Sequence, residues 1–258
     1  STLISSNLVK NGTGTFTLSG NNSSFIGEII ANAGTLIASH ASALGASAKG
    51  TIVASGATLD VRANVGAEPV TLNGGTLSVP SGSISMSGAL TLGANSTISV
   101  GGTQLALSGV IDDGAGPYGF TKTGSGSLLL SGANTYGGAA TISAGPLNLG
   151  ASNVIPDASA VSLALGTTFN LNNYSDTIGS LAGAGNVSLG SAALTTGGNN
   201  TSTTYSGVIS GTGSLVKNGS GTFILSGNNT YSGTTTINGG SLQLGSGGTS
   251  GIFGTGNV

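Results

Sequence analysis

Side chains able to do acid–base chemistry are scarce in this chain. There is one histidine, His40, and there are seven carboxylates: Glu28, Asp60, Glu68, Asp112, Asp113, Asp157 and Asp176. A Ser-His-Asp triad would have to use His40. That histidine lies between Ser39 and Ala41 in a run of small residues, without the nucleophile elbow of a hydrolase. We therefore interpret His40 as an exposed loop residue.

Asp112 and Asp113 are the one adjacent pair of carboxylates. Glycosidases place two carboxylates on either side of the bond they cleave. Neighbouring residues of a strand point to opposite faces, so these two would converge only in a loop. A solvated turn, or weak Ca²⁺ coordination with nearby carbonyls, is the favoured interpretation. We expect no catalytic, cofactor-binding or metal-binding residue, and an enzyme that cuts polysaccharides with Asp112, Asp113 or Asp157 is the least favoured alternative.

Three of the four lysines share one position in a sequence repeat. Lys10, Lys122 and Lys217 each precede a Gly-x-Gly segment, and their positions differ by 122 − 10 = 112 and 217 − 122 = 95. None of these segments continues as G-x-G-x-x-G before a helix or as G-K-[ST], so they are not phosphate loops. We interpret the lysines as side chains that lie along the coil surface and bond turn carbonyls.

Aromatic residues follow the lysines at a second shared position. Phe25, Tyr136 and Tyr231 align there, beside Asn22, Asn134 and Asn229. Exposed tyrosines could form a carbohydrate-binding row, but several coils would separate them. Aromatic and Asn residues also stack well at the turns of repeat proteins, and we favour this structural role.

The composition excludes several classes of protein. Charged residues make up 5% of the chain, against about 25% in typical soluble domains, and glycine contributes 49 of 258 residues. Hydrophobic residues make up 37% and the net charge is −2, so the chain can form a core and differs from disordered proteins. Scattered lysines argue against nucleic acid binding. No apolar run approaches the roughly 20 residues of a membrane helix, and zero cysteines exclude disulfides.

Short alternating apolar pairs predict many half-buried strands of three to five residues, separated by Gly- and Asn-rich turns. The repeat favours a solenoid over a sandwich or closed barrel, because each solenoid coil contacts only its neighbours. The positions of Leu36, Leu59 and Leu77 differ by 59 − 36 = 23 and 77 − 59 = 18, and either step fits one coil of a three-sided parallel β-helix. We predict one continuous solenoid over 1–258, with repeat copies at about 8–36, 120–150 and 215–245 and a less typical region at 60–119.

The pattern G-x-G-S-L-x-K-x-G-x-G-x-x-x-L-S-G-x-N-x-Y-x-G, carried in full by residues 211–233 and followed by T-x-I and G-x-L, resembles the autotransporter-associated β-strand repeat. The clear copies cover about a third of the chain, and copy one departs from the pattern at Phe25 and Glu28. The resemblance implies an all-β, right-handed parallel β-helix from the passenger of a Gram-negative autotransporter. It implies an extracellular or cell-surface location and leaves activity open.

We therefore expect a non-enzymatic structural or adhesive module without cofactors. Expected partners are other copies of the chain, stacked head-to-tail through the solenoid ends into filaments, and host or matrix glycans or proteins. Nucleic acid binding and membrane insertion are not expected. A monomeric passenger stalk that displays an effector outside this segment is the main alternative.

Overall fold

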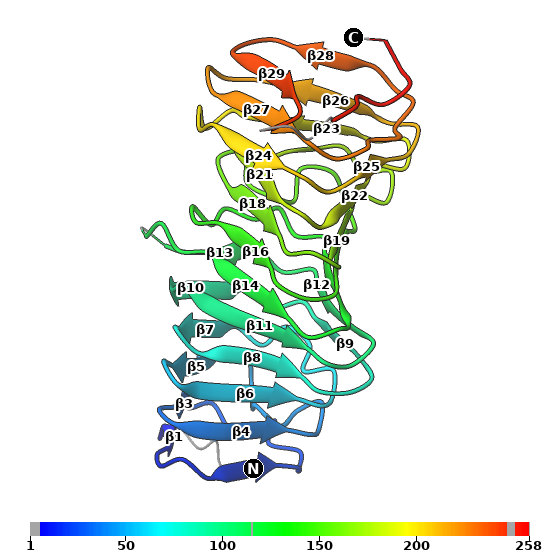
Figure 1. The fold of residues 1–258 in the computed structure, drawn as a ribbon. Helices are drawn as coiled ribbons and strands as arrows, with labels where there is room; N and C mark the ends of the chain where they lie inside the picture. Colours follow the sequence, from blue (N-terminus) through cyan, green and yellow to red (C-terminus); the bar gives the residue numbers. More distant parts are fainter. Residues whose placement is uncertain (1–5, 115, 247–250, 258) are drawn as a thin grey trace. The chain divides into compact units, whose positions relative to one another are not determined.

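The computed structural model describes residues 6–114, 116–246 and 251–257. It divides into two compact units, Ser1–Gly138 and Ala139–Val258. In both units the described residues form short strands joined by turns, without a helix (Figure 1). The strand pairs described within each unit are parallel, and the predicted all-β parallel β-solenoid is confirmed. The prediction of a single continuous solenoid over 1–258 stays a prediction.

The first unit coils through three parallel sheets. The first sheet contains β1 (Leu8–Lys10), β3 (Ile29–Ala31), β5 (Thr51–Ala54), β7 (Val70–Asn73), β10 (Leu90–Ala94) and β13 (Ile111–Asp112). The second contains β2 (Thr15–Leu18), β4 (Gly34–Ala38), β6 (Ala57–Val61), β8 (Thr76–Val79), β11 (Ser96–Val100) and β14 (Phe120–Thr123). The third contains β9 (Ser83–Met86), β12 (Gln104–Leu107) and β15 (Ser127–Leu130).

Pairing register defines the length of a coil in this unit. In the second sheet Leu36 aligns with Leu59, Leu59 with Leu77, Leu77 with Ile98 and Ile98 with Lys122. Successive differences in residue number are 59 − 36 = 23, 77 − 59 = 18, 98 − 77 = 21 and 122 − 98 = 24. The coil length predicted from the spacing of the leucines is thus confirmed.

These aligned positions also form the core. Strand alternation turns every second side chain inward, so identical register positions stack into columns. Leu36, Leu59, Leu77 and Ile98 are fully buried and form one such column. Burying a Leu or Ile side chain contributes about 1.5–3 kcal/mol, so each coil is stabilised mainly by its neighbours.

The second unit repeats this architecture with three sets of parallel strands. One sheet contains β16 (Ala140–Ile142), β18 (Ala160–Leu163), β21 (Ser180–Gly183), β24 (Thr203–Tyr205), β27 (Thr222–Leu225) and β29 (Ser241–Leu244). Another contains β17 (Pro146–Leu149), β19 (Thr168–Asn170), β22 (Asn186–Ser188) and β25 (Ile209–Ser210). The last contains β20 (Asp176–Thr177), β23 (Ala193–Thr196), β26 (Ser214–Lys217) and β28 (Thr235–Ile237).

Candidate functional site

The three repeat lysines point into the interior of their coils. Lys10 ends β1, Lys217 ends β26 and Lys122 is the third residue of β14. Their exposed fractions are 7%, 1% and 0%. The predicted surface position of these side chains is therefore wrong. Each lysine lies two residues after an inward apolar residue of its strand, and strand alternation places both on the same side.

Backbone carbonyls of the corner hold each ammonium group, and this part of the prediction is confirmed. Lys217 Nζ donates to the carbonyl oxygens of Asn218 (2.6 Å) and Gly219 (3.1 Å), and to that of Gly239 (3.3 Å) in the next coil. The lysine thus clamps two successive coils. The corresponding bonds are Lys10 Nζ to Gly12 O and Ala33 O, both 2.8 Å, and Lys122 Nζ to Thr123 O at 3.2 Å and Gly124 O at 2.8 Å.

The glycine two residues after each lysine completes the corner. Gly12, Gly124 and Gly219 have φ values of +77°, +76° and +71°, a left-handed conformation that side chains other than hydrogen disfavour. This turn presents the glycine carbonyl to Nζ in each copy. The K-x-G spacing therefore encodes a corner whose interior carbonyls are satisfied by the lysine.

Burial makes the ammonium form of these lysines less favourable. It lowers the pKa of Lys122 to about 8, and it lowers the pKa of Lys217 as well. Both Nζ atoms donate hydrogen bonds to backbone carbonyl oxygens. The lysines therefore act as internal cations held by backbone dipoles.

The tyrosines at the second repeat position are fully buried. Tyr136 and Tyr231 have no exposed surface. Tyr136 packs edge-to-face on Phe120, with ring centroids 5.4 Å apart, and the hydroxyl of Tyr231 bonds that of Thr235 at 2.6 Å. The predicted structural role is confirmed, since a carbohydrate platform would need exposed rings.

The neighbouring asparagines bind backbone of the preceding coil. Asn134 Oδ1 accepts from the amide of Ile111 at 2.7 Å, and Asn229 Oδ1 accepts from the amide of Ile209 at 2.9 Å. Both asparagines are buried. They satisfy strand amides at places where the next coil has a turn in place of a strand.

Asp112 and Asp113 bind separate sets of donors. Asp112 accepts from the hydroxyl of Thr91 at 3.2 Å and the amide of Gly114 at 3.1 Å. Oδ2 of the buried Asp113 accepts from the amides of Tyr118 (3.1 Å) and Gly137 (2.7 Å). Both carboxylates thus tie turn backbone to the solenoid.

Two other carboxylates are buried with raised pKa values. Burial raises the pKa of Glu68 to about 7, an effect opposed by the hydrogen bond from the Thr51 hydroxyl at 2.9 Å. Burial also raises the pKa of Asp176 to about 6, with nearby Asp157 adding to the shift. Asp176 Oδ2 accepts from the amide of Val154 at 2.9 Å, whereas its buried Oδ1 has no hydrogen-bond partner.

His40 and the remaining carboxylates occupy separate places in the fold. His40 is half-buried, and its Nδ1 accepts from the amide of Ser42 at 3.1 Å. Asp60 forms an ion pair with Arg62 at 2.8 Å, Glu28 contacts Asn7, and Asp157 is exposed. Among residues 6–114, 116–246 and 251–257, no group of three His, Cys, Asp or Glu side chains could hold a metal ion. The expectation that none of these residues is catalytic stays a prediction.

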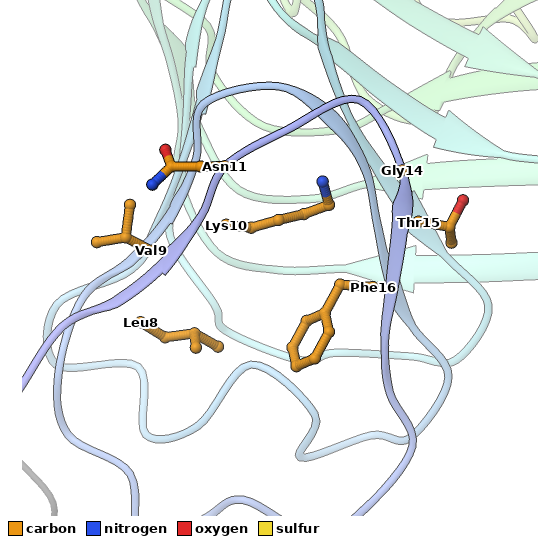
Figure 2. A pocket seen from close by; sticks show the side chains of 7 residues that line it. All are labelled: Leu8, Val9, Lys10, Asn11, Gly14, Thr15 and Phe16. Atoms are coloured by element: carbon orange, nitrogen blue, oxygen red, sulfur yellow. The ribbon is translucent and has the colours of Figure 1, made fainter.

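Two cavities lie at the outer edge of the first unit. One, of about 370 Å³, is lined by the first repeat corner, where Figure 2 shows Leu8, Lys10 and Phe16 on the inner side. The second, of about 380 Å³, is lined mainly by apolar and Asn residues, Phe25 among them. Strands β1 and β2 pair on one side only within the described part of the chain, and Phe16 is 44% exposed. This edge therefore exposes core-type side chains and unpaired backbone.

A parallel β-solenoid with K-x-G-x-G corners defines a class of repeat protein, and the comparisons identify the repeat. The passenger-associated-transport-repeat family matches residues 8–38, 120–149 and 215–244. The adhesin BmaC autotransporter of Brucella suis biovar 1 (strain 1330) is 37% identical over 90 residues. This alignment covers 33% of the chain and 3% of that relative, and no solved structure matches. The chain therefore carries three autotransporter passenger repeats, and the resemblance predicted from the sequence is confirmed.

The three repeat matches and the parallel strand pairing agree on a β-solenoid built from passenger-type repeats. No helix in the described residues is long and apolar enough to cross a membrane.

Proposed function

We propose that the chain is a non-enzymatic adhesive and structural β-solenoid of the bacterial surface. The observation that supports this function most directly is the combination of three passenger repeats with similarity to an autotransporter adhesin. The direct test coats beads with the chain and counts their attachment to host cells and to extracellular matrix. We expect attachment above that of albumin-coated beads, and attachment no higher than albumin would reject an adhesive function.

We further propose that solenoids associate head-to-tail. At one edge β1 and β2 expose Val9 (45%) and Phe16 (44%). At the other, β28 and β29 are the last strands of their sheets and expose Ile237 (44%) and Leu244 (42%). The amide of Thr235, at the start of β28, is already bonded to the carbonyl of Asn257. Open parallel edges of this kind bind a further strand through backbone hydrogen bonds and apolar contact.

Substitutions that add charge at the β1–β2 edge test this head-to-tail association. Val9→Lys with Phe16→Lys adds two charges beside the unpaired strands, which disfavours strand pairing. Sedimentation and electron microscopy should detect filaments or oligomers of the natural chain and their loss in this variant. Val110→Lys, at a 39% exposed valine away from both edges, is the control. A strictly monomeric natural chain at high concentration would reject head-to-tail association.

A second candidate function is a stalk that displays an effector outside this segment. It is favoured by the length of the relative, of which the aligned segment covers 3%. A stalk predicts isolated rods by electron microscopy and no attachment of coated beads. Attachment by this chain alone would favour the adhesive function.

A further inference from the structure

One outward position of the second sheet of the first unit carries threonine in six successive strands. Pairing register aligns these residues one above the other, and Figure 1 shows β4, β6, β8, β11 and β14 stacked side by side. We call this row the threonine column. It consists of Thr15, Thr35, Thr58, Thr76, Thr97 and Thr121.

Strand propensity and composition do not account for the threonine column. Threonine suits exposed strand positions in general, so propensity would act equally on every sheet. Threonine makes up 32 of 258 residues. The outward positions of the first sheet read instead Val9, Ile30, Ile52, Thr71, Thr91 and Asp112, and those of the third sheet read Ser83, Gln104 and Ser127.

The hydroxyls of the threonine column are available to a partner. Within the described residues, none of the six forms a hydrogen bond to the protein, whereas Thr91 on the neighbouring sheet bonds Asp112. Each hydroxyl can donate one hydrogen bond and accept others. The β-branched side chain restricts χ1, so the hydroxyls are held in place before binding.

A second, broken row of hydroxyls runs beside the column. Two residues further along the same strands lie Thr17, Ile37, Asp60, Ser78, Ser99 and Thr123. This row is interrupted by Ile37 and by Asp60, whose charge is paired with Arg62. Strands stand about 4.8 Å apart and residues i and i+2 about 6.6 Å apart. The face therefore presents one continuous row of hydroxyls and a second, broken one, without an unpaired charge along the column.

We propose that the threonine column binds an extended, neutral polysaccharide chain that lies across the strands. The neutral face offers no unpaired cation for the strong charge-assisted bonds that phosphate or sulfate groups form. Sugar hydroxyls both donate and accept, as threonine hydroxyls do, and a polymer of identical rings can meet one coil after another. Single hydroxyl contacts are weak, at about 1 kcal/mol, but contacts in series raise the apparent affinity. This proposal rests on the proposed adhesive function and names its partner.

The test replaces hydroxyls by methyl groups of the same shape. A triple variant, Thr58→Val, Thr76→Val and Thr97→Val, keeps the β-branched side chains of the column. The matched control makes the same change at Thr71, Thr177 and Thr195, which are half-buried strand threonines outside it. Pull-down on insoluble cellulose and chitin should detect binding of the natural chain and the control, and at least about tenfold weaker binding of the column variant.

Several outcomes would overturn the proposal. These are no binding of the natural chain to either polysaccharide, equal binding by the column variant, or binding only to heparin or to protein-coated wells. Circular dichroism melting of both variants checks that they fold alike. Attachment of coated beads separates the two ideas: attachment without polysaccharide binding leaves the adhesive function standing and rejects the threonine column as its glycan site.

Discussion

Replacing Lys217 by methionine tests whether a buried ammonium stabilises the repeat corner. Methionine keeps most of the apolar stem, so packing inside the coil is largely preserved. The change removes the donor for three carbonyl oxygens, those of Asn218, Gly219 and Gly239. Because Lys217 is 1% exposed, water has little access to these oxygens from its side.

Two opposing effects determine how much Lys217→Met changes the free energy of unfolding. A buried carbonyl left without a donor costs about 1–3 kcal/mol, so three carbonyls would cost up to about 9 kcal/mol. Against this, removing a buried charge recovers its desolvation penalty, which the lowered pKa of Lys217 reflects. We expect Lys217→Met to lower the free energy of unfolding by about 3 kcal/mol, because the recovered desolvation penalty offsets part of the cost of the unpaired carbonyls. Lys217→Ala should lose about 2–3 kcal/mol more, because the apolar stem is also removed.

Urea unfolding followed by circular dichroism measures the loss, and native-state hydrogen exchange locates it in β26 to β29. Repeat arrays unfold segment by segment, so exchange shows whether the effect is local. Lys49→Met, at the one exposed lysine of a turn, is the matched control and should change stability by less than about 0.5 kcal/mol. A Lys217→Met variant as stable as the natural chain, or more stable, would refute the clamp and show the buried charge to be a net cost.

Three further predictions concern buried charge and close backbone contacts. The pKa of Lys122 in the folded chain is about 8, whereas that of lysine in the unfolded chain is about 10.4, so the unfolded state binds more protons between these pH values. The free energy of unfolding should therefore rise from about pH 8 to pH 10. Lys122→Met should flatten this rise, measured as urea midpoints. Glu68 and Asp176, with pKa values raised to about 7 and 6, bind more protons when folded, so stability should fall by up to about 3 kcal/mol per group from pH 4 to pH 7. Glu68→Gln with Asp176→Asn should remove that fall in the same assay. Gly126→Ala would place Cβ 1.9 Å from a backbone oxygen of the preceding coil and should lower the urea midpoint by the equivalent of about 2–3 kcal/mol, whereas Gly198→Ala, with no atom within 4 Å, should not.

Much of the fold could be predicted because it depends on local periodicity. Alternation identified the strands, and the spacing of Leu36, Leu59 and Leu77 indicated the coil length that pairing register confirms. The predicted surface position of the lysines is wrong because a charged side chain need not be exposed when backbone carbonyls bind it. The alternation itself held the contrary signal, since Lys122 lies two residues after the inward Phe120.

The threonine column could not be predicted in the same way. Its members are brought together by pairing between coils of unequal length, with steps of 58 − 35 = 23, 76 − 58 = 18, 97 − 76 = 21 and 121 − 97 = 24 in residue number. Because the steps vary, the threonines do not recur at a fixed period in the sequence. Local patterns set which side of a strand faces the core, but only the register between coils sets which outward residues become neighbours.

The spacing of the repeats explains why their shared positions do not line up in space. The strand order shows that the path from Lys10 in β1 to Lys122 in β14 covers five coils and one additional strand. Copy one therefore turns from the first sheet to the second, between β1 and β2, and copy two turns from the second sheet to the third, between β14 and β15. The lysine, the left-handed glycine and the carbonyls they join all come from the corner or its neighbouring coil, so the same motif works at either corner. Because the repeat stabilises corners wherever it falls, it places no demand on outward side chains, and the three faces are free to carry recognition.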